Sequence, residues 1–231
     1  MKIELCAASL EAIQIAAKYN FDRIELCQAL EIGGLTPSMA LQKMAFNLFP
    51  NIHVLIRCRS GNFVYSKLEK ELMLKDIEES MELGAAGVVV GSLLEDFTLD
   101  IDFISTIRKK HPNLELTFHR AFDDLENPLD SLELLIDLGV NRVLTSGGKE
   151  SVTEGISQIK ECVSKSNGRI EIMIGGGINE NNISAILDQI KPQAVHFSGT
   201  IPNDKKSNSL FEENILVLNE NKVINILKNI Q

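Results

Sequence analysis

The sequence has no tryptophan, only two tyrosines and little positive charge. The net charge of −9 argues against a nucleic-acid partner, because contacts with phosphates need clustered lysine and arginine. No apolar run reaches the ~18–20 residues of a membrane span. The first residues lack the charged and then apolar pattern of a signal peptide. We therefore expect a cytoplasmic protein with no membrane or nucleic-acid partner.

Short apolar or β-branched runs alternate with longer segments of helical period. The eight candidate strands are residues 2–6, 22–27, 52–57, 87–90, 114–119, 141–145, 170–174 and 194–198. One helical segment separates each run from the next, which implies parallel pairing with right-handed crossovers. Eight such units favour a single (β/α)8 TIM barrel over an open doubly wound sheet. Because no linker divides the chain, we expect one domain over residues 1–231.

Local signals mark several helix starts and the end of the chain. Thr36–Pro37 and Asn127–Pro128 each place a capping residue before a proline at the first helical position. A polar loop at 202–209 is predicted to follow the eighth strand, and a last helix lies near 220–230.

The tetrapeptide Ile-Glu-Leu-Cys occurs at 3–6 and again at 24–27, in the first two predicted strands. Side chains alternate across a strand, so the isoleucines and leucines face one way and the glutamates and cysteines the other. In a barrel the aliphatic residues pack against helices. We therefore predict that Glu4, Glu25, Cys6 and Cys27 point into the barrel, with the cysteines nearest its mouth.

The cysteines are few, and two of them are predicted to meet. The chain has four, which are expected to stay reduced. Neighbouring strands lie ~4.8 Å apart, so Cys6 and Cys27 can approach closely. Paired thiolates favour Cu(I), while the alternative is two small buried hydrophobic side chains. Cys58 follows the third strand and is a candidate third sulfur, whereas Cys162 lies in a helix.

Ionisable side chains gather at the C-terminal ends of the predicted strands. The candidate catalytic residues are Glu25, Arg57, His119, Arg120 and Asp123. Buried charge is costly unless it is paired or faces a ligand, so a self-satisfied ion-pair network is the alternative. Three of the candidates, His119, Arg120 and Asp123, lie close together in the sequence at the end of the fifth predicted strand. Histidine exchanges protons near neutral pH, which makes this cluster the most suggestive of catalysis.

Three loops after the sixth, seventh and eighth strands are predicted to bind an anion. The candidate residues are Ser146, Gly147, Gly175, Gly176, Gly177, Ser198 and Gly199. Glycine lets backbone N–H groups approach an oxyanion, and the last two loops of many barrels hold phosphate. The alternative is that the corners of a barrel simply require glycine.

Several stretches together resemble the copper homeostasis protein CutC family. They are residues 23–27, 33–38, 117–123 and 143–147, with the triplet 175–177 and His196 with Ser198. The resemblance covers nearly the whole chain. It implies a β/α barrel, a cytoplasmic location and a role in copper handling, with Cu(I) bound by cysteines that correspond to Cys6 and Cys27. The sequence departs from the family pattern at Cys58, where proline is usual, and at Asn62, where aspartate is usual.

Two functions are therefore predicted. The first is a cytoplasmic copper homeostasis protein that binds Cu(I) through Cys6 and Cys27. The second is a TIM-barrel enzyme acting on a small phosphorylated or carboxylated anion, because a polar mouth with glycine loops is typical of an enzyme site. The sequence leaves open whether the protein is an enzyme and whether it forms a homo-oligomer.

Overall fold

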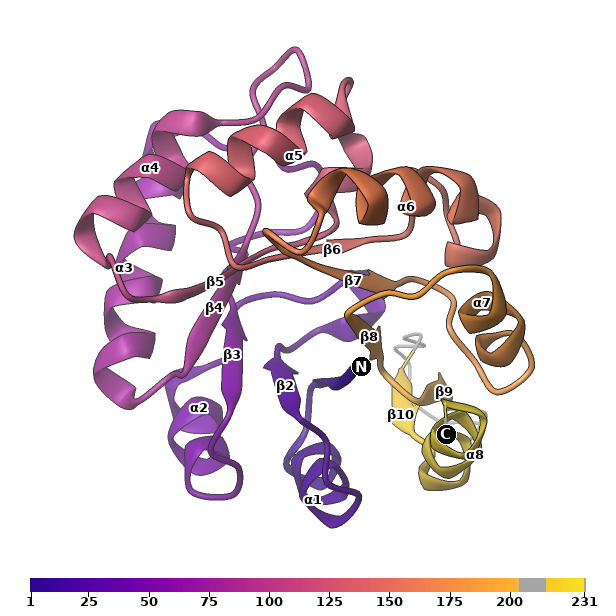
Figure 1. The fold of residues 1–231 in the computed structure, drawn as a ribbon. Helices are drawn as coiled ribbons and strands as arrows, with labels where there is room; N and C mark the ends of the chain where they lie inside the picture. Colours follow the sequence, from indigo (N-terminus) through magenta and orange to yellow (C-terminus); the bar gives the residue numbers. More distant parts are fainter. Residues whose placement is uncertain (204–214, 231) are drawn as a thin grey trace, which may run out of the picture.

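The computed structural model describes residues 1–203 and 215–230. Among these residues eight parallel strands close into a barrel in chain order, β1 to β8. The strands are β1 (Lys2–Ala7), β2 (Arg23–Leu26), β3 (Ile52–Leu55), β4 (Gly87–Val90), β5 (Glu115–Phe118), β6 (Arg142–Thr145), β7 (Glu171–Gly175) and β8 (Ala194–Phe197). Figure 1 shows the helices as a ring outside the strands. The predicted (β/α)8 barrel is confirmed.

Helices follow the strands in regular alternation. They are α1 (Leu10–Lys18), α2 (Met39–Phe46), α3 (Lys67–Leu83), α4 (Ile101–Lys110), α5 (Pro128–Asp137), α6 (Val152–Ser166), α7 (Ile183–Gln189) and α8 (Glu220–Ile230), with 3-10 turns η1 (Leu30–Ile32) and η2 (Arg120–Asp124). A short antiparallel pair, β9 (Thr200–Pro202) and β10 (Leu216–Leu218), was not predicted. Most of the predicted loop 202–209 lies outside the described residues.

Local sequence sets where the helices begin. Ser66 and Glu69 form a capping box at the start of α3. The prediction at Asn127–Pro128 is confirmed, since Asn127 stands at the N-cap position of α5, without a capping hydrogen bond from its side chain, and the proline takes the first helical position. The prediction at Thr36–Pro37 is wrong, because Ser38 caps α2. The Thr36 hydroxyl instead accepts the Arg57 backbone N–H, which ties this segment to the end of β3.

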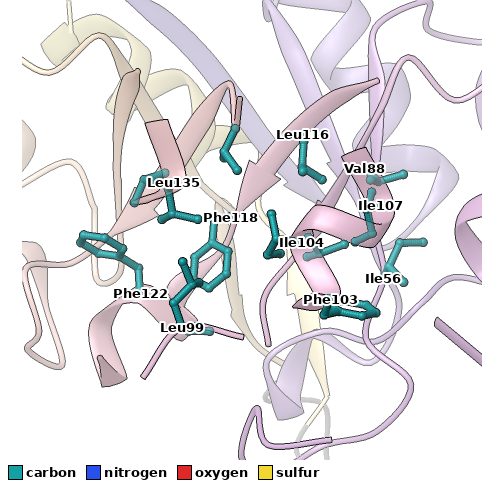
Figure 2. Packing of buried hydrophobic residues seen from close by; sticks show 14 of the residues in the cluster. Ile56, Val88, Leu99, Phe103, Ile104, Ile107, Leu116, Phe118, Phe122 and Leu135 are labelled. Carbon is teal, nitrogen blue, oxygen red and sulfur yellow. The ribbon is translucent and has the colours of Figure 1, made fainter. Parts of the chain in front are cut away.

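The main apolar core lies between the strands and the helices. Figure 2 shows part of it, in which Val88, Leu116 and Phe118 of β4 and β5 belong to one buried cluster with Phe103, Ile104 and Ile107 of α4. A fully buried side chain of this kind contributes about 1.5–3 kcal/mol. Because this outer layer supplies the apolar burial, the barrel interior can hold polar side chains.

The side chains of β1 and β2 alternate between the barrel interior and the helices as the repeated tetrapeptide predicts. Leu5, Ile24 and Leu26 belong to an outer cluster. Cys6 and Cys27 belong to a separate cluster with Leu55 and Val89. In the register of β1 and β2, Cys6 lies beside Glu25 and Glu4 beside Arg23. The two glutamates and two cysteines therefore point into the barrel, as predicted.

Within residues 1–203 and 215–230, no helix has the length and apolar character needed to cross a membrane.

Candidate functional site

Ion pairs fill the N-terminal half of the barrel interior. The Arg23 guanidinium donates to Glu4 through Nε and, over 3.1 Å, to Glu171 through Nη2. Arg142 donates to the same Glu171 carboxylate. Burial alone would raise the pKa of Glu4, but its hydrogen bond with His196 and the Arg23 charge outweigh burial and hold that pKa well below its usual range. This layer is the self-satisfied ion-pair network that the sequence left open as an alternative to a ligand site. Because its charged side chains pair with one another, they need no ligand.

Arg23 and Arg142 were not among the residues predicted for the site. Both begin their strands and lie two residues before an inward side chain, Glu25 in β2 and Leu144 in β6. The two-residue period of a strand places them inside the barrel. That period, applied to all eight strands, would have found both arginines.

Two thiols meet above this network. The sulfur atoms of Cys6 and Cys27 lie 3.8 Å apart, and both side chains are buried. The Cys6 S–H donates to Glu25 Oε1 over 3.5 Å. The Cys27 thiol, burial and the Glu25 carboxyl group together raise the pKa of Cys6 well above its usual value. Cys6 is therefore a neutral thiol at neutral pH.

The structure does not bring Cys58 to this pair. Cys58 packs against the outer core, while the preceding residue, Arg57, lines the barrel interior. Cys162 is buried in the same outer layer. Both are thus separated from the pair by the strands, and both serve as natural control positions.

His196 joins the cysteine pair to the ion-pair layer. Its Nδ1 lies 2.6 Å from Glu4 Oε1, which fixes the imidazole. Burial lowers the pKa of His196, but the Glu25 charge and the Glu4 hydrogen bond outweigh burial and raise it. Burial also raises the pKa of Glu25. One ligand atom each from Cys6, Glu25 and His196 lie within 4.8 Å of one another, a spacing that can hold a metal ion.

His119 is an uncharged donor on the opposite side of the barrel mouth. Its Nδ1 accepts the Ala121 backbone N–H over 3.0 Å, so the ring proton lies on Nε2. Burial, followed by the Arg57 charge, lowers the pKa of His119 to about 3. Gly91 makes room for the ring, since a Cβ there would lie 2.3 Å from His119 Cε1. Among the described residues, the buried Nε2 has no hydrogen-bond partner.

Arg57 is held by backbone carbonyls. Nη1 donates to Ile32 O and Gly34 O, over 3.1 and 3.0 Å, and Nη2 donates to Gly61 O over 2.8 Å. Its charge forms no ion pair with a carboxylate in the described part of the chain. Nε is buried and without a partner there. Arg57 therefore positions two loops while its Nε N–H stays unused.

The side chain of Asp123, a residue of η2, reaches into the loop after β6. Its carboxylate accepts the backbone N–H groups of Ser146 and Gly148, each over 3.0 Å, and the Thr145 hydroxyl. Arg120 donates to the same carboxylate over 2.9 Å. The Gly147 N–H donates to Thr145 Oγ1. The N–H groups of this predicted anion loop thus already have partners inside the protein.

The predicted anion loop after β7 lies beside this one, and the loop after β8 packs against α8. Gly176 packs against Ser146 and the Arg120 guanidinium, and Gly177 faces Ser151. Gly175 ends β7. The Ser198 and Thr200 hydroxyl oxygens lie 2.8 Å apart, and Gly199 faces Val223 of α8. Anion binding by these two loops stays a prediction.

A cavity of about 130 Å³ brings most of the candidates together. Its polar lining consists of Cys6, Glu25, Arg57, His119, Arg120 and His196. Asp123 and the glycine loops do not line it. A second hollow of about 320 Å³ adjoins it, since Cys6 and Leu30 line both. The mouth thus combines a soft sulfur pair with a partly open cavity that is lined by both polar and apolar side chains.

Comparison with known proteins identifies a family match. The model of the CutC family matches residues 1–201. A CutC from Pasteurella multocida is 44% identical over 201 residues, 86% of this chain and 82% of that protein. A CutC from Glaesserella parasuis is 41% identical over 200 residues, with the same coverage.

Solved structures include one of the same family and others that share only the barrel fold. The crystal structure of a CutC from Streptococcus agalactiae, described as a copper homeostasis protein, has a TM-score of 0.80 and 34% identity over 85% of this chain and 97% of that one. Phosphoribosylanthranilate isomerase from Pyrococcus furiosus has a TM-score of 0.61 at 15% identity, covering 99% and 98% of the two chains. The second likeness concerns the barrel fold alone.

Proposed function

This chain belongs to the CutC family, and we propose that it is a copper homeostasis protein that binds Cu(I) through Cys6 and Cys27. The observation that carries the proposal is the 3.8 Å separation of two buried sulfur atoms. A thiolate sulfur lies ~2.3 Å from a bound zinc ion, so two sulfurs can share an ion of that size at any separation up to about 4.6 Å. Thiolate is also the ligand class that selects Cu(I).

The surroundings of the pair suit a monovalent ion. Two thiolates and one Cu(I) leave a net charge of −1 in a buried site, which is costly unless it is offset. His196, whose pKa is raised, lies within reach of Cys6 and offsets that charge when protonated. Its imidazole is also a suitable copper ligand when neutral. We place this role in the cytoplasm, where free cysteines stay reduced.

The test is an anaerobic titration of reduced protein against a competing Cu(I) chelator. Wild type is compared with the double substitution Cys6→Ser, Cys27→Ser. The matched controls are Cys58→Ser and Cys162→Ser, which remove sulfurs of the outer layer. We expect the double variant alone to lose at least tenfold in affinity. Equal affinity in the double variant and wild type would refute the proposal.

A second candidate function is the binding and turnover of a small organic anion at the same mouth. Three side chains that line the 130 Å³ cavity each keep a buried polar atom without a partner in the described chain: Glu25 Oε2, Arg57 Nε and His119 Nε2. Buried polar groups are nearly always satisfied, so three unpaired atoms around one cavity favour a ligand. This function requires that a small anion stabilise the metal-free protein, and that His119→Gln remove the effect.

A further inference from the structure

We infer that the ligand of the 130 Å³ cavity is a carboxylate of two to four carbons with an oxygen on C2, that is, a 2-hydroxy or 2-oxo acid. Arg57 and His119 hold its carboxylate, and Glu25 contacts the oxygen on C2. The inference rests on the second candidate function and narrows its substrate class. It draws on the size, the charge and the hydrogen-bonding groups of the cavity.

Size sets the first limit. A cavity of ~150 Å³ accommodates benzene, which has six non-hydrogen atoms. The volume here, about 130 Å³, therefore suits a ligand of about six such atoms. Lactate and pyruvate are of this size, whereas a phosphate ester on the same carbon skeleton has several more non-hydrogen atoms. The lining also includes Leu30, Leu55 and Leu144, which can contact a short alkyl group.

Charge sets the second limit. Arg57 is 6% exposed and has no carboxylate partner among the described residues. A buried cation is costly unless an anion offsets it. Arg120, the other arginine of the lining, is already paired with Asp123. Of the two arginines in the lining, Arg57 is therefore the one that an anionic group of a ligand would complement.

The same neighbourhood disfavours phosphate. In the predicted anion loop after β6, the backbone N–H groups of Ser146 and Gly148 donate to the Asp123 carboxylate and are not free for phosphate. His119 is uncharged at neutral pH and offers one N–H. One cation and two single N–H donors, Arg57 Nε and His119 Nε2, match the two oxygens of a carboxylate.

The remaining unpaired polar atom, Glu25 Oε2, favours a ligand with an oxygen on C2. Glu25 is 5% exposed, and its Oε1 accepts the Cys6 S–H while Oε2 has no partner in the described chain. A carboxylate at this place accepts a hydrogen bond from a 2-hydroxyl group, and a protonated carboxyl group donates one to a 2-oxo group. Glu25 therefore distinguishes these acids from simple fatty acids of the same length.

The experiment measures thermal unfolding of the reduced, metal-free protein with lactate, pyruvate and glycolate at matched ionic strength. Propionate lacks the oxygen on C2, lactamide lacks the charge, and phosphate and sulfate test the rival anions. At ~100 times the dissociation constant, we expect lactate or pyruvate to raise the melting temperature by about 5–10 °C. We expect a far smaller rise in melting temperature with propionate, lactamide, phosphate or sulfate.

Variants assign the effect to the cavity. His119→Gln and Arg57→Lys should weaken lactate binding at least tenfold by calorimetry, and Glu25→Ala should abolish the preference for lactate over propionate. Because Arg57 also holds two loops, its variant is interpreted only beside the other two. Arg169→Gln removes an arginine of an exposed ion pair and should leave binding unchanged.

Each outcome decides a different claim. Stabilisation by phosphate or sulfate alone would overturn the inference and leave the second candidate function standing. Absence of stabilisation by every anion would remove both. Equal binding of lactate by wild type, His119→Gln and Glu25→Ala would place the ligand elsewhere and overturn the inference. None of these results bears on Cu(I) binding, because the protein carries no metal in these assays.

Discussion

At the scale of single residues, the neutral state of Cys6 governs how the pair can bind a metal. A raised pKa means that Cu(I) must displace the thiol proton, so binding releases it. We predict that the apparent Cu(I) affinity rises by about tenfold per pH unit between about pH 6 and 8 for each proton released. Competition titrations across that range measure the slope. A slope of zero in wild type would contradict the assignment of Cys6 as a ligand.

Asp123 gives a second residue-scale prediction. Its carboxylate accepts two backbone N–H groups, the Thr145 hydroxyl and the Arg120 guanidinium. Hydrogen bonds to charged groups contribute ~1.5–3 kcal/mol each, although their effects overlap. Asp123→Asn should lower the free energy of unfolding by about 2–3 kcal/mol in urea titrations. The neighbouring Asp124→Asn is the control, and an equal loss there would argue against a specific role for Asp123.

The sequence predicted some of these residues and not others. The repeated tetrapeptide placed Cys6 and Cys27 together, because strand periodicity and spacing are local rules. It could not show that Asp123 fills the loop after β6, or that backbone carbonyls hold Arg57. Both contacts join segments more than 20 residues apart. Such contacts depend on how loops close over the barrel, which no local pattern encodes.

At the scale of elements, Arg23 links strands β1, β2 and β7 through Glu4 and Glu171. Removing one partner of a buried pair leaves an uncompensated charge and costs ~3–5 kcal/mol. We therefore expect Arg23→Ala to lower the free energy of unfolding by about that amount. Arg169→Ala, which breaks an exposed pair with Glu133, should cost about 0–1 kcal/mol. Similar losses in the two variants would show that the interior network is not specially stabilising.

Element boundaries show the same limit of sequence reasoning. The eight strands were predicted within two residues at each end, since their apolar runs are distinct. The start of α2 was misplaced because Thr36 pairs with the end of β3. Gly87 of β4 makes room for the ring of His53 in β3, and Gly91, just after β4, makes room for the ring of His119, just after β5. That need arises only once the barrel closes.

At the scale of the whole molecule, two buried neutral histidines make stability depend on pH. Burial, the largest cause in each case, lowers the pKa of His53 and His119 from 6.5 to about 3. The unfolded chain therefore binds protons that the folded chain rejects, and stability falls as pH decreases from about 6.5 towards 3. Each histidine should cost about 2 kcal/mol at about pH 5.

Urea titrations at several pH values measure this slope. His53→Gln and His119→Gln should each flatten it relative to wild type. His196 acts in the opposite direction, because its raised pKa gives stability that is present below the unfolded pKa and is lost as pH rises through the folded one. Equal pH slopes in wild type, His53→Gln and His119→Gln between about pH 7 and 5 would contradict the burial of neutral histidines.

The length of the chain and the alternation of strand-like with helix-like segments were sufficient to predict the barrel, and the family match agrees with that prediction. The extent of one domain over residues 1–231 and the formation of a homo-oligomer stay predictions. What sequence reasoning could not provide is the division of the interior into a paired lower layer and a mouth with unpaired polar atoms. That division depends on which charges meet across the barrel.

The central claim is that Cys6 and Cys27 bind Cu(I), and copper-edge X-ray absorption spectroscopy tests it most directly. Reduced protein is loaded anaerobically with less than one equivalent of Cu(I). We predict sulfur neighbours of copper in wild type and in Cys58→Ser, and loss of those neighbours in the double variant Cys6→Ser, Cys27→Ser. A wild-type spectrum with only nitrogen and oxygen neighbours, or the same sulfur signal in the double variant, would contradict the claim.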